Sequence, residues 1–298
     1  MNILILGKGF FGTRINNFLN KQENIHSEIY SRKELDYCNF NTLHDAIMFH
    51  GQSYPKYDVV INASGYTGIP NIDSAEDNME ECYYNNVIVP LNIYKACSEL
   101  QVPMIHLSSG CIYNGYEKHF TEEDTPNFGM FTAESSFYSK TKHIVEMYLS
   151  DKACWMLRLR MPFCGEDVSR NLLKKIMNYN NLISMDNSLT SVDDFCNFLL
   201  KMLNMRMYLP YGKYNVVNEG YITAKDIVGI LAECGFVNPN HVFIPLDELG
   251  TKARRSNCIL STEKIKSKNL ELPPVGKSIK IAIKQLVGES SWPERVLF

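Results

Sequence analysis

The sequence lacks the features that mark a membrane-bound, exported or nucleic-acid-binding protein. No apolar run reaches about 18 residues, so we expect no membrane-spanning helix and no membrane partner. The net charge of the 298 residues is only −3, which gives no basic field to attract nucleic acid. The apolar N-terminus has no charged region and runs straight into a glycine turn, so it predicts a strand rather than a signal peptide.

The sequence also lacks ordered cysteine and histidine spacings. Its nine cysteines are scattered, odd in number and without a CxxC pair, which predicts reduced thiols in a cytoplasmic protein. The seven histidines show no metal-ligand spacing, so we predict no metal site. No linker, repeat or low-complexity segment interrupts the chain, and we therefore expect its lobes to pack closely.

Apolar runs alternate with helical stretches along the first half of the chain. The runs that predict strands lie at residues 2–6, 27–31, 59–63, 104–108 and 154–160. Helices are predicted at 13–20, 79–100 and 136–149. This alternation predicts an α/β fold, a Rossmann-type doubly wound parallel sheet, with an NAD(P)-binding domain at residues 1–163.

Beyond residue 163 the pattern is mixed. Helices are predicted near 172–179, 192–203 and 224–233, and one short strand near 213–218 could return to the sheet. We assign residues 164–298 to a smaller substrate-binding lobe.

A glycine-rich turn follows the first strand directly. Gly7, Gly9 and Gly12 form a GxGxxG pattern that also contains Phe10 and Phe11. Glycines there permit a tight turn and a close approach of the backbone to a pyrophosphate, which then faces a helix N-terminus. The alternative is an ordinary strand-to-helix turn, but the flanking strand and helix favour a dinucleotide site.

The end of the second strand predicts which nicotinamide cofactor binds. Arg32 stands where an NAD site usually has a carboxylate, and it could bind the 2′-phosphate of NADPH; alternatively it is a solvated surface cation. We predict NADPH and leave NADH open. Asp36 is a further candidate for cofactor binding.

Small residues at the end of the third strand would lie against the cofactor. Ala63, Ser64 and Gly65 follow that strand and let the backbone approach closely. A tight turn without a ligand is the alternative.

A Tyr–Lys pair indicates proton-transfer chemistry. Tyr138 and Lys142 are four residues apart and would share one face of a helix. A lysine ammonium close to a phenol is expected to lower the tyrosine pKa from about 10 and to allow proton exchange with a carbonyl oxygen. Ser109 ends a strand about 30 residues earlier, where it could hydrogen-bond the same oxygen.

Several longer segments resemble one family. The chain resembles the extended short-chain dehydrogenase/reductases of the dTDP-4-dehydrorhamnose reductase branch. It is most similar to the bifunctional UDP-4-keto-6-deoxyglucose 3,5-epimerase/4-reductases that make UDP-L-rhamnose. The segments that carry the resemblance are 62–68, 110–113, 122–128, 136–142, 157–162 and 254–257.

The resemblance implies a reductase and an epimerase function. It implies Ser109, Tyr138 and Lys142 as the reductase triad, and Cys111 with Lys175 as the pair that epimerises C3 and C5. Both carbons flank the C4 ketone, so a base can remove a proton from one face and an acid can return one to the other. We predict the Cys111 thiolate as the base, a form that a nearby cation such as Lys175 would favour. The alternative for Cys111 is a buried small hydrophobe, and the alternative for Lys175 is a solvated helix residue.

The resemblance also implies a nucleotide-sugar substrate and a homodimer formed through the helices at 79–100 and 136–149. The candidate substrate-binding residues are Thr67, Asn86, Asn171, Arg255 and Asn257. Arg255 would contact phosphate, because arginine binds it in bidentate fashion; a surface salt bridge or helix cap is the alternative.

Two other functions are compatible with these residues. One is a dTDP-4-dehydrorhamnose reductase without epimerase activity, which would not need Cys111 or Lys175. The other is a non-catalytic, reductase-like regulatory subunit, against which the intact Ser109, Tyr138 and Lys142 argue. The loop at 114–120 and the segment at 163–169 depart from the family pattern, so the sequence leaves UDP and dTDP open.

Overall fold

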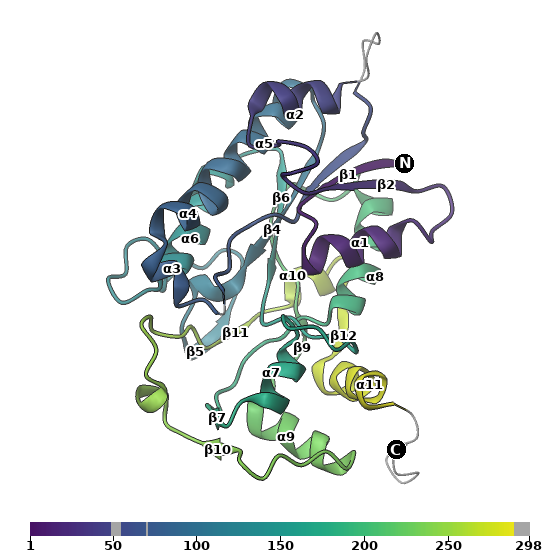
Figure 1. The fold of residues 1–298 in the computed structure, drawn as a ribbon. Coiled ribbons are helices and arrows are strands. Elements are labelled where there is room, and N and C mark those ends of the chain that lie inside the picture. The colour runs from purple at the N-terminus through teal and green to yellow at the C-terminus, as the bar shows by residue number, and fades with distance from the viewer. Residues whose placement is uncertain (49–54, 70, 289–298) are drawn as a thin grey trace.

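The computed structural model of the chain describes residues 1–48, 55–69 and 71–288. Within these residues, six parallel strands form the central sheet in the order β2-β1-β3-β4-β6-β8 (Figure 1). Their bounds are β1 (Asn2–Leu6), β2 (His26–Tyr30), β3 (Val59–Asn62), β4 (Met104–Ser109), β6 (Cys154–Leu159) and β8 (Gly212–Asn215). The prediction of a parallel, Rossmann-type sheet is confirmed.

The strand order places a crevice between β1 and β3. The chain runs from β1 outward to β2 and then returns to β3 on the other side of β1. Parallel α/β sheets bind ligands at such a switch point, beyond the carboxyl ends of the strands. The glycine turn after β1 and the small residues after β3 therefore border the same crevice.

Helices cover both faces of the sheet. One face carries α1 (Phe10–Leu19) and α8 (Val192–Met205), and the other carries α2 (Phe40–Ile47), α5 (Val89–Glu99) and α6 (Phe137–Leu149) (Figure 1). The central strands β3 and β6 are wholly buried, as expected for a sheet covered on both sides. The predicted helix at 79–100 is divided into α4 (Met79–Tyr83), the π turn η1 (Tyr84–Ile88) and α5.

A smaller lobe packs below the carboxyl end of the sheet (Figure 1). Its apolar core joins α7 (Leu172–Asn178), α9 (Ala224–Glu233) and α11 (Val275–Val287). Three short parallel strand pairs lie outside the central sheet in the described part of the chain. They are β5 (Gly115–Phe120) with β11 (Cys258–Leu260), β7 (Asn181–Leu182) with β10 (Val242–Phe243), and β9 (Asn218–Glu219) with β12 (Leu272–Pro274).

The segment after residue 163 does not stay within the small lobe. α8 packs on α1, and β8 pairs with β6 at the edge of the central sheet. The remaining short elements are α3 (Ser74–Asp77), η2 (Gly110–Ile112), η3 (Leu246–Leu249) and α10 (Glu263–Lys266). No helix in the described part of the chain is long and apolar enough to span a membrane. The same residues contain no cluster of three or more His, Cys, Asp or Glu side chains arranged to hold a metal ion.

Candidate active site

The turn after β1 is shaped by its three glycines. Gly7 has a φ of +108°, and a Cβ there would lie 2.6 Å from the Ser64 nitrogen. A Cβ at Gly12 would lie 2.0 Å from the Gly7 carbonyl oxygen, so only glycine lets α1 approach the turn this closely. A Cβ at Gly9, in contrast, would meet no described atom within 4 Å.

Gly9 opens the N-terminus of α1 toward the crevice. It is the N-cap residue of α1, and no side chain of the described residues caps that helix end. The first N–H groups of a helix lack partners within the helix and carry its positive dipole end. The open space at Gly9 and the uncapped helix end therefore suit the pyrophosphate of a dinucleotide.

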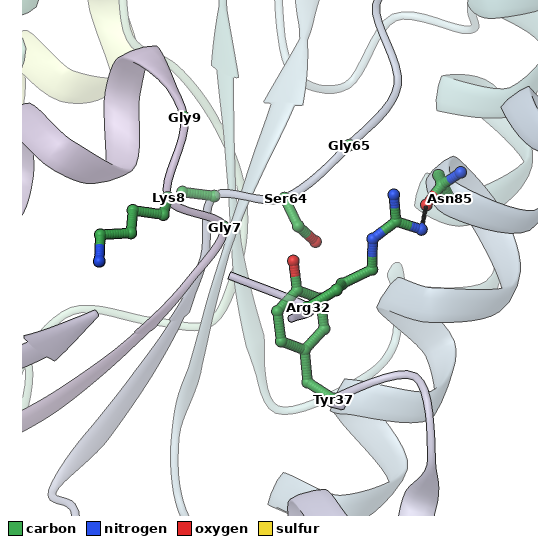
Figure 2. Close-up of a pocket in the computed structure, with 9 residues that line it drawn as sticks. Gly7, Lys8, Gly9, Arg32, Tyr37, Ser64, Gly65 and Asn85 are labelled. Atoms are coloured by element: carbon green, nitrogen blue, oxygen red, sulfur yellow. Dashed lines mark hydrogen bonds between the residues drawn. The ribbon is translucent and has the colours of Figure 1, made fainter. Parts of the chain in front are cut away.

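A small pocket of about 140 Å³ adjoins this turn (Figure 2). The Arg32 guanidinium reaches from the end of β2 to Asn85, where its Nη1 donates a hydrogen bond of 2.6 Å to Oδ1. Figure 2 shows the Tyr37 hydroxyl pointing toward Ser64. The lining residues are Gly7, Lys8, Gly9, Arg32, Tyr37, Ala63, Ser64, Gly65 and Asn85. The pocket thus combines a cation with open backbone, the environment that a ribose phosphate requires.

The loop after β3 is held from both sides. Asn62 Oδ1 accepts hydrogen bonds from the Ser64 nitrogen at 3.0 Å and the Ser64 hydroxyl at 2.6 Å. Asn86 Oδ1 accepts from the Tyr66 nitrogen at 2.8 Å, and Asn86 Nδ2 donates to the Tyr66 oxygen at 3.0 Å. Gly65, which lies between these two anchors, therefore has a fixed backbone beside the cofactor crevice.

A larger cleft of about 950 Å³ lies between the sheet domain and the small lobe. It shares Gly9, Ala63, Ser64 and Gly65 with the small pocket, so one extended molecule can occupy both. Phe10 and Phe11, from the start of α1, line the cleft as well. The residues that could hold a dinucleotide thus lead directly to the cleft wall.

Ser109, Tyr138 and Lys142 all line the large cleft. The Ser136 hydroxyl caps α6 by accepting from the Ser139 nitrogen at 3.1 Å, so the helix begins at Phe137 and carries Tyr138 in its first turn. One turn later, the Lys142 ammonium lies 5.7 Å from the centre of the Tyr138 ring. The sequence therefore predicted three residues that the fold does bring together.

Burial controls the protonation of this cluster. Burial raises the pKa of Tyr138, and the nearby Cys111 adds to the rise, while a hydrogen bond with Ser109 opposes it. Burial lowers the pKa of Lys142, and Cys111 opposes that shift. The expectation that Lys142 lowers the tyrosine pKa is thus corrected: burial of the phenol outweighs the groups that lower it. The Tyr138 phenol holds its proton at neutral pH and can act as an acid.

A buried ion pair fixes α6 against the sheet behind the cluster. The Arg158 guanidinium donates from Nε and Nη2 to the Glu146 carboxylate, with a closest distance of 2.7 Å. The Ser108 hydroxyl donates to the same carboxylate at 2.6 Å. Glu146 lies one turn beyond Lys142, and Ser108 precedes Ser109. The ion pair therefore sets the position of α6 relative to the end of β4, and removing one partner would leave a buried charge.

Cys111 and Lys175 line the same cleft, and their pKa values are shifted in opposite directions. Burial raises the pKa of the Cys111 thiol, against hydrogen bonds from Ser109 and Ser139. Burial, with Arg170 and Arg255 nearby, lowers the pKa of the Lys175 amine. The raised pKa favours the thiol of Cys111 and so corrects the prediction of a thiolate base, while the lowered pKa makes the neutral form of Lys175 easier to reach than in a solvated lysine. The two directions suit Cys111 as an acid and Lys175 as a base.

The wall of the cleft that the small lobe forms is rich in cations. Arg170, Lys175 and Arg255 line it, together with Thr67 and Asn257. This wall is tied to the sheet domain by contacts between residues far apart in the sequence. Arg255 pairs with Asp73 at 3.0 Å, Lys252 with Asp77 at 2.6 Å, Arg254 with Glu134, and Arg170 Nη1 donates to the Thr67 hydroxyl.

Two predicted substrate residues are not brought to the cleft. Asn171 is fully buried, and its Oδ1 caps α7 by accepting from the Leu173 nitrogen at 3.1 Å. Asn86 is also fully buried and holds the loop after β3. Asparagine is favoured at helix caps and in loop anchors as well as at ligands, so its presence alone does not separate these roles.

Two further differences concern the cofactor end. Asp36 lies outside the small pocket, and its Oδ1 accepts from the Cys38 nitrogen at 3.2 Å. Tyr37 and Asn85 line that pocket but were not predicted. The signal for Tyr37 was its place beside Arg32 and Asp36, whereas no local pattern indicated Asn85, which is 53 residues from Arg32.

The parallel sheet, the glycine turn and the Ser–Tyr–Lys cluster define a short-chain dehydrogenase/reductase of the extended kind. The model of the RmlD substrate binding domain matches residues 1–287, and the chain belongs to this family. The resemblance inferred from the sequence is therefore confirmed.

Similar proteins come from a plant and from a virus. A bifunctional dTDP-4-dehydrorhamnose 3,5-epimerase/dTDP-4-dehydrorhamnose reductase of Arabidopsis thaliana is 32% identical over 74% of this chain and 74% of its own length. A trifunctional UDP-glucose 4,6-dehydratase/UDP-4-keto-6-deoxy-D-glucose 3,5-epimerase/UDP-4-keto-L-rhamnose-reductase of the same plant is also 32% identical, but the match spans only 33% of its length. The crystal structure of the L780 UDP-rhamnose synthase from Acanthamoeba polyphaga mimivirus has a TM-score of 0.84 and 25% identity, covering 96% of this chain and 99% of that chain.

Proposed function

We propose that the protein epimerises C3 and C5 of UDP-4-keto-6-deoxyglucose and then reduces its C4 ketone with NADPH, giving UDP-L-rhamnose. One observation carries the proposal: Ser109, Tyr138, Lys142, Cys111 and Lys175 line a single cleft. The activities named for the plant and viral relatives agree with it.

Reduction uses the buried acid of the cluster. Bound NADPH supplies the hydride that C4 receives. Tyr138 gives its phenolic proton to the C4 oxygen, and the Ser109 hydroxyl donates a hydrogen bond to the same oxygen. The Lys142 ammonium stabilises the tyrosinate that forms. The products are a C4 alcohol and NADP⁺, and solvent returns the proton to Tyr138.

Epimerisation uses the same oxygen-binding groups and two further residues. Lys175, as a neutral amine, removes the proton from a carbon beside the ketone, and the electron pair moves into an enolate. Ser109 and Tyr138 stabilise the enolate oxygen by hydrogen bonding. Cys111, as a thiol, returns a proton to the opposite face, and the configuration inverts. Solvent then takes the proton from Lys175 and reprotonates the Cys111 thiolate, so that both residues are ready for the second carbon. The pKa directions of Lys175 and Cys111 support this division of roles.

The cofactor proposal rests on the small pocket. The open space at Gly9 suits the pyrophosphate, and Arg32 suits the 2′-phosphate that distinguishes NADPH from NADH. Ser64 and Gly65 then continue toward the cleft, where the nicotinamide would meet the catalytic cluster. These residues fit NADPH; NADH would forgo the contact with Arg32.

The substrate proposal rests on the cation-rich wall. Arg170 and Arg255 would bind the diphosphate, while Thr67 and Asn257 would bind the sugar or the ribose. We assign cofactor binding to residues 1–163. Residues 164–298 would supply most contacts to the sugar nucleotide, with Thr67 contributing from the first domain, whereas α8 and β8 complete the sheet domain.

The proposal is tested by supplying each nucleotide sugar with each cofactor. The protein is incubated with UDP- or dTDP-4-keto-6-deoxyglucose and NADPH or NADH, and the sugar product is identified. UDP-L-rhamnose formed with NADPH is the expected result. Reduction of only a pre-epimerised sugar would identify a plain 4-keto reductase. Absence of any turnover would favour the non-catalytic subunit.

We also propose a cytoplasmic homodimer, in keeping with nine free cysteines and an exposed apolar surface. That surface lies on neighbouring helices, where Tyr83, Tyr84, Ile88, Met147 and Tyr148 are each between 39% and 61% exposed. Sedimentation should give twice the 34.2 kDa chain mass, and Tyr148→Arg should shift it toward the monomer. A wild-type monomer would contradict this part of the proposal.

A further inference from the structure

A π turn interrupts the helix that borders the cofactor crevice. The Val89 nitrogen bonds to the Tyr84 oxygen, five residues earlier, so η1 contains one more residue than an α-helical turn. As a result the consecutive residues Asn85, Asn86 and Val87 are all buried. Such single π turns occur frequently at functional sites, because they redirect side chains that a regular helix would turn away.

Asn85 uses its two amide atoms for two different partners. Its Nδ2 donates to the Glu81 oxygen at 2.8 Å within the helix, and its Oδ1 accepts from Arg32 Nη1 at 2.6 Å. The bond to the helix carbonyl fixes which end of the amide faces Arg32. Asn85 is only 7% exposed, so its side chain is held in place while the guanidinium that it binds lines the small pocket (Figure 2).

The next residue anchors a different part of the crevice. Asn86 binds the backbone of Tyr66 through both of its amide atoms and donates from Nδ2 to the Thr141 hydroxyl at 3.1 Å. The π turn thus delivers one asparagine to the phosphate end of the crevice and one to the loop beside Lys142. Because both positions depend on the same turn, Asn85 has a fixed location relative to the rest of the crevice.

The charge of Arg32 is not neutralised by this contact. Lys8, the other cation of the pocket, forms an ion pair with Glu34 at 2.7 Å. Arg32 forms no ion pair with any carboxylate in the described ranges, and its partner Asn85 is neutral. A neutral acceptor restricts the guanidinium without cancelling its charge, so that charge stays available for an anionic ligand.

We propose that Asn85 is a specificity-determining residue for the cofactor: it positions the Arg32 guanidinium over the small pocket so that Arg32 binds a 2′-phosphate. The inference rests on the NADPH part of the proposed function and deepens it. Asn85 itself acts through Arg32, and restricting a flexible cation in advance lowers the entropy cost of binding.

The test compares NADPH and NADH binding without any sugar. Dissociation constants are measured by cofactor fluorescence for the full chain, with 2′,5′-ADP as a competitor. Asn85→Ala should weaken NADPH by about three- to tenfold, the cost of ordering one long side chain. Asn85→Asp, which pairs Arg32 with a carboxylate, should weaken NADPH by about tenfold or more. Both variants should leave NADH within about twofold.

The control makes the same chemical change elsewhere. Asn17→Asp alters an exposed residue of α1 and should leave both constants unchanged. If Asn85→Asp does not fold, Asn85→Ala, which adds no charge, still decides the question. In an Arg32→Ala background, Asn85→Ala should have no further effect on NADPH, because the two residues act as a unit.

The possible results separate this inference from the proposed function. An unchanged NADPH-to-NADH ratio in Asn85→Ala, with wild-type protein that prefers NADPH, would overturn the role of Asn85 alone. Equal losses for both cofactors would show a merely structural role and would also overturn it. Wild-type protein that does not prefer NADPH would overturn this inference together with the cofactor part of the proposed function.

Discussion

The cofactor turn and the sugar-facing wall of the cleft are built in different ways. The turn is made of backbone: Gly7 and Gly12 permit close packing, and Gly9 leaves open space at a helix end. The wall is made of long cationic side chains, such as Arg255, which pairs with Asp73 from 182 residues away. The turn is thus fixed by local geometry, whereas the wall depends on how distant segments pack.

This difference predicts different responses to change. A binding site formed by backbone atoms loses its ligand when a substitution adds a side chain there, because the backbone itself forms the contact surface. A site built from several flexible side chains loses one contact at a time, and its neighbours can partly compensate. The two regions should therefore be separable by mutation, with the catalytic cluster between them.

The largest effect on rate is expected from a substitution in the catalytic cluster, which lies outside both regions. Tyr138→Phe keeps the ring but removes the acidic proton, so the rate of C4 reduction should fall by about 10²–10⁴-fold. Cofactor binding should stay within about twofold. Single-turnover oxidation of NADPH measures the rate, and wild-type reduction by the variant would exclude Tyr138 as the acid.

A single substitution in the glycine turn should abolish cofactor binding. Gly9→Val places a side chain where the pyrophosphate would lie, and its φ of −106° accommodates valine. NADPH binding should weaken by at least about 10²-fold in a folded protein. Gly229→Val is the matched control, since a Cβ there also meets no atom of the described chain within 4 Å. Normal cofactor affinity in Gly9→Val would remove the turn from the site.

The wall should lose substrate affinity without losing the cofactor. Arg255→Ala removes one charged contact to the diphosphate, so the KM for the sugar nucleotide should rise by about 10- to 100-fold. The dissociation constant of NADPH should not change. Arg206→Ala, a cation outside the cleft, serves as the control. A weakened cofactor in Arg255→Ala would show that the two regions are not separable.

The smallest effect is expected on the preference of the cofactor site for NADPH over NADH. Arg32→Ala should weaken NADPH by about tenfold and NADH by less than about twofold, because only NADPH carries the 2′-phosphate. Lys33→Ala, the adjacent exposed cation, should change neither. Equal weakening of both cofactors, or of neither, would show that Arg32 does not recognise the 2′-phosphate.

The sequence alone predicted the features that depend on local spacing along the chain. The strands and the glycine turn follow from local spacing, and Ser109, Tyr138 and Lys142 follow from their places at a strand end and on a helix face. Asn171 and Asn86 show the limit, because an asparagine that caps a helix or anchors a loop has the same local pattern as one that binds a ligand. The role of Asn85 could not be predicted from the sequence, since it depends on a π turn and on a contact with a residue 53 positions away.

The most direct test of the proposed function follows solvent deuterium into C3 and C5 of the keto-sugar. Wild-type protein should exchange the hydrogen atoms at both C3 and C5 for solvent deuterium. Cys111→Ser keeps nearly the same volume but is a far weaker proton donor, so exchange should collapse while a pre-epimerised sugar is still reduced. Lys175→Ala should impair exchange at one or both carbons. Wild-type protein that never exchanges deuterium, or a Cys111→Ser variant that loses both activities together, would contradict the account.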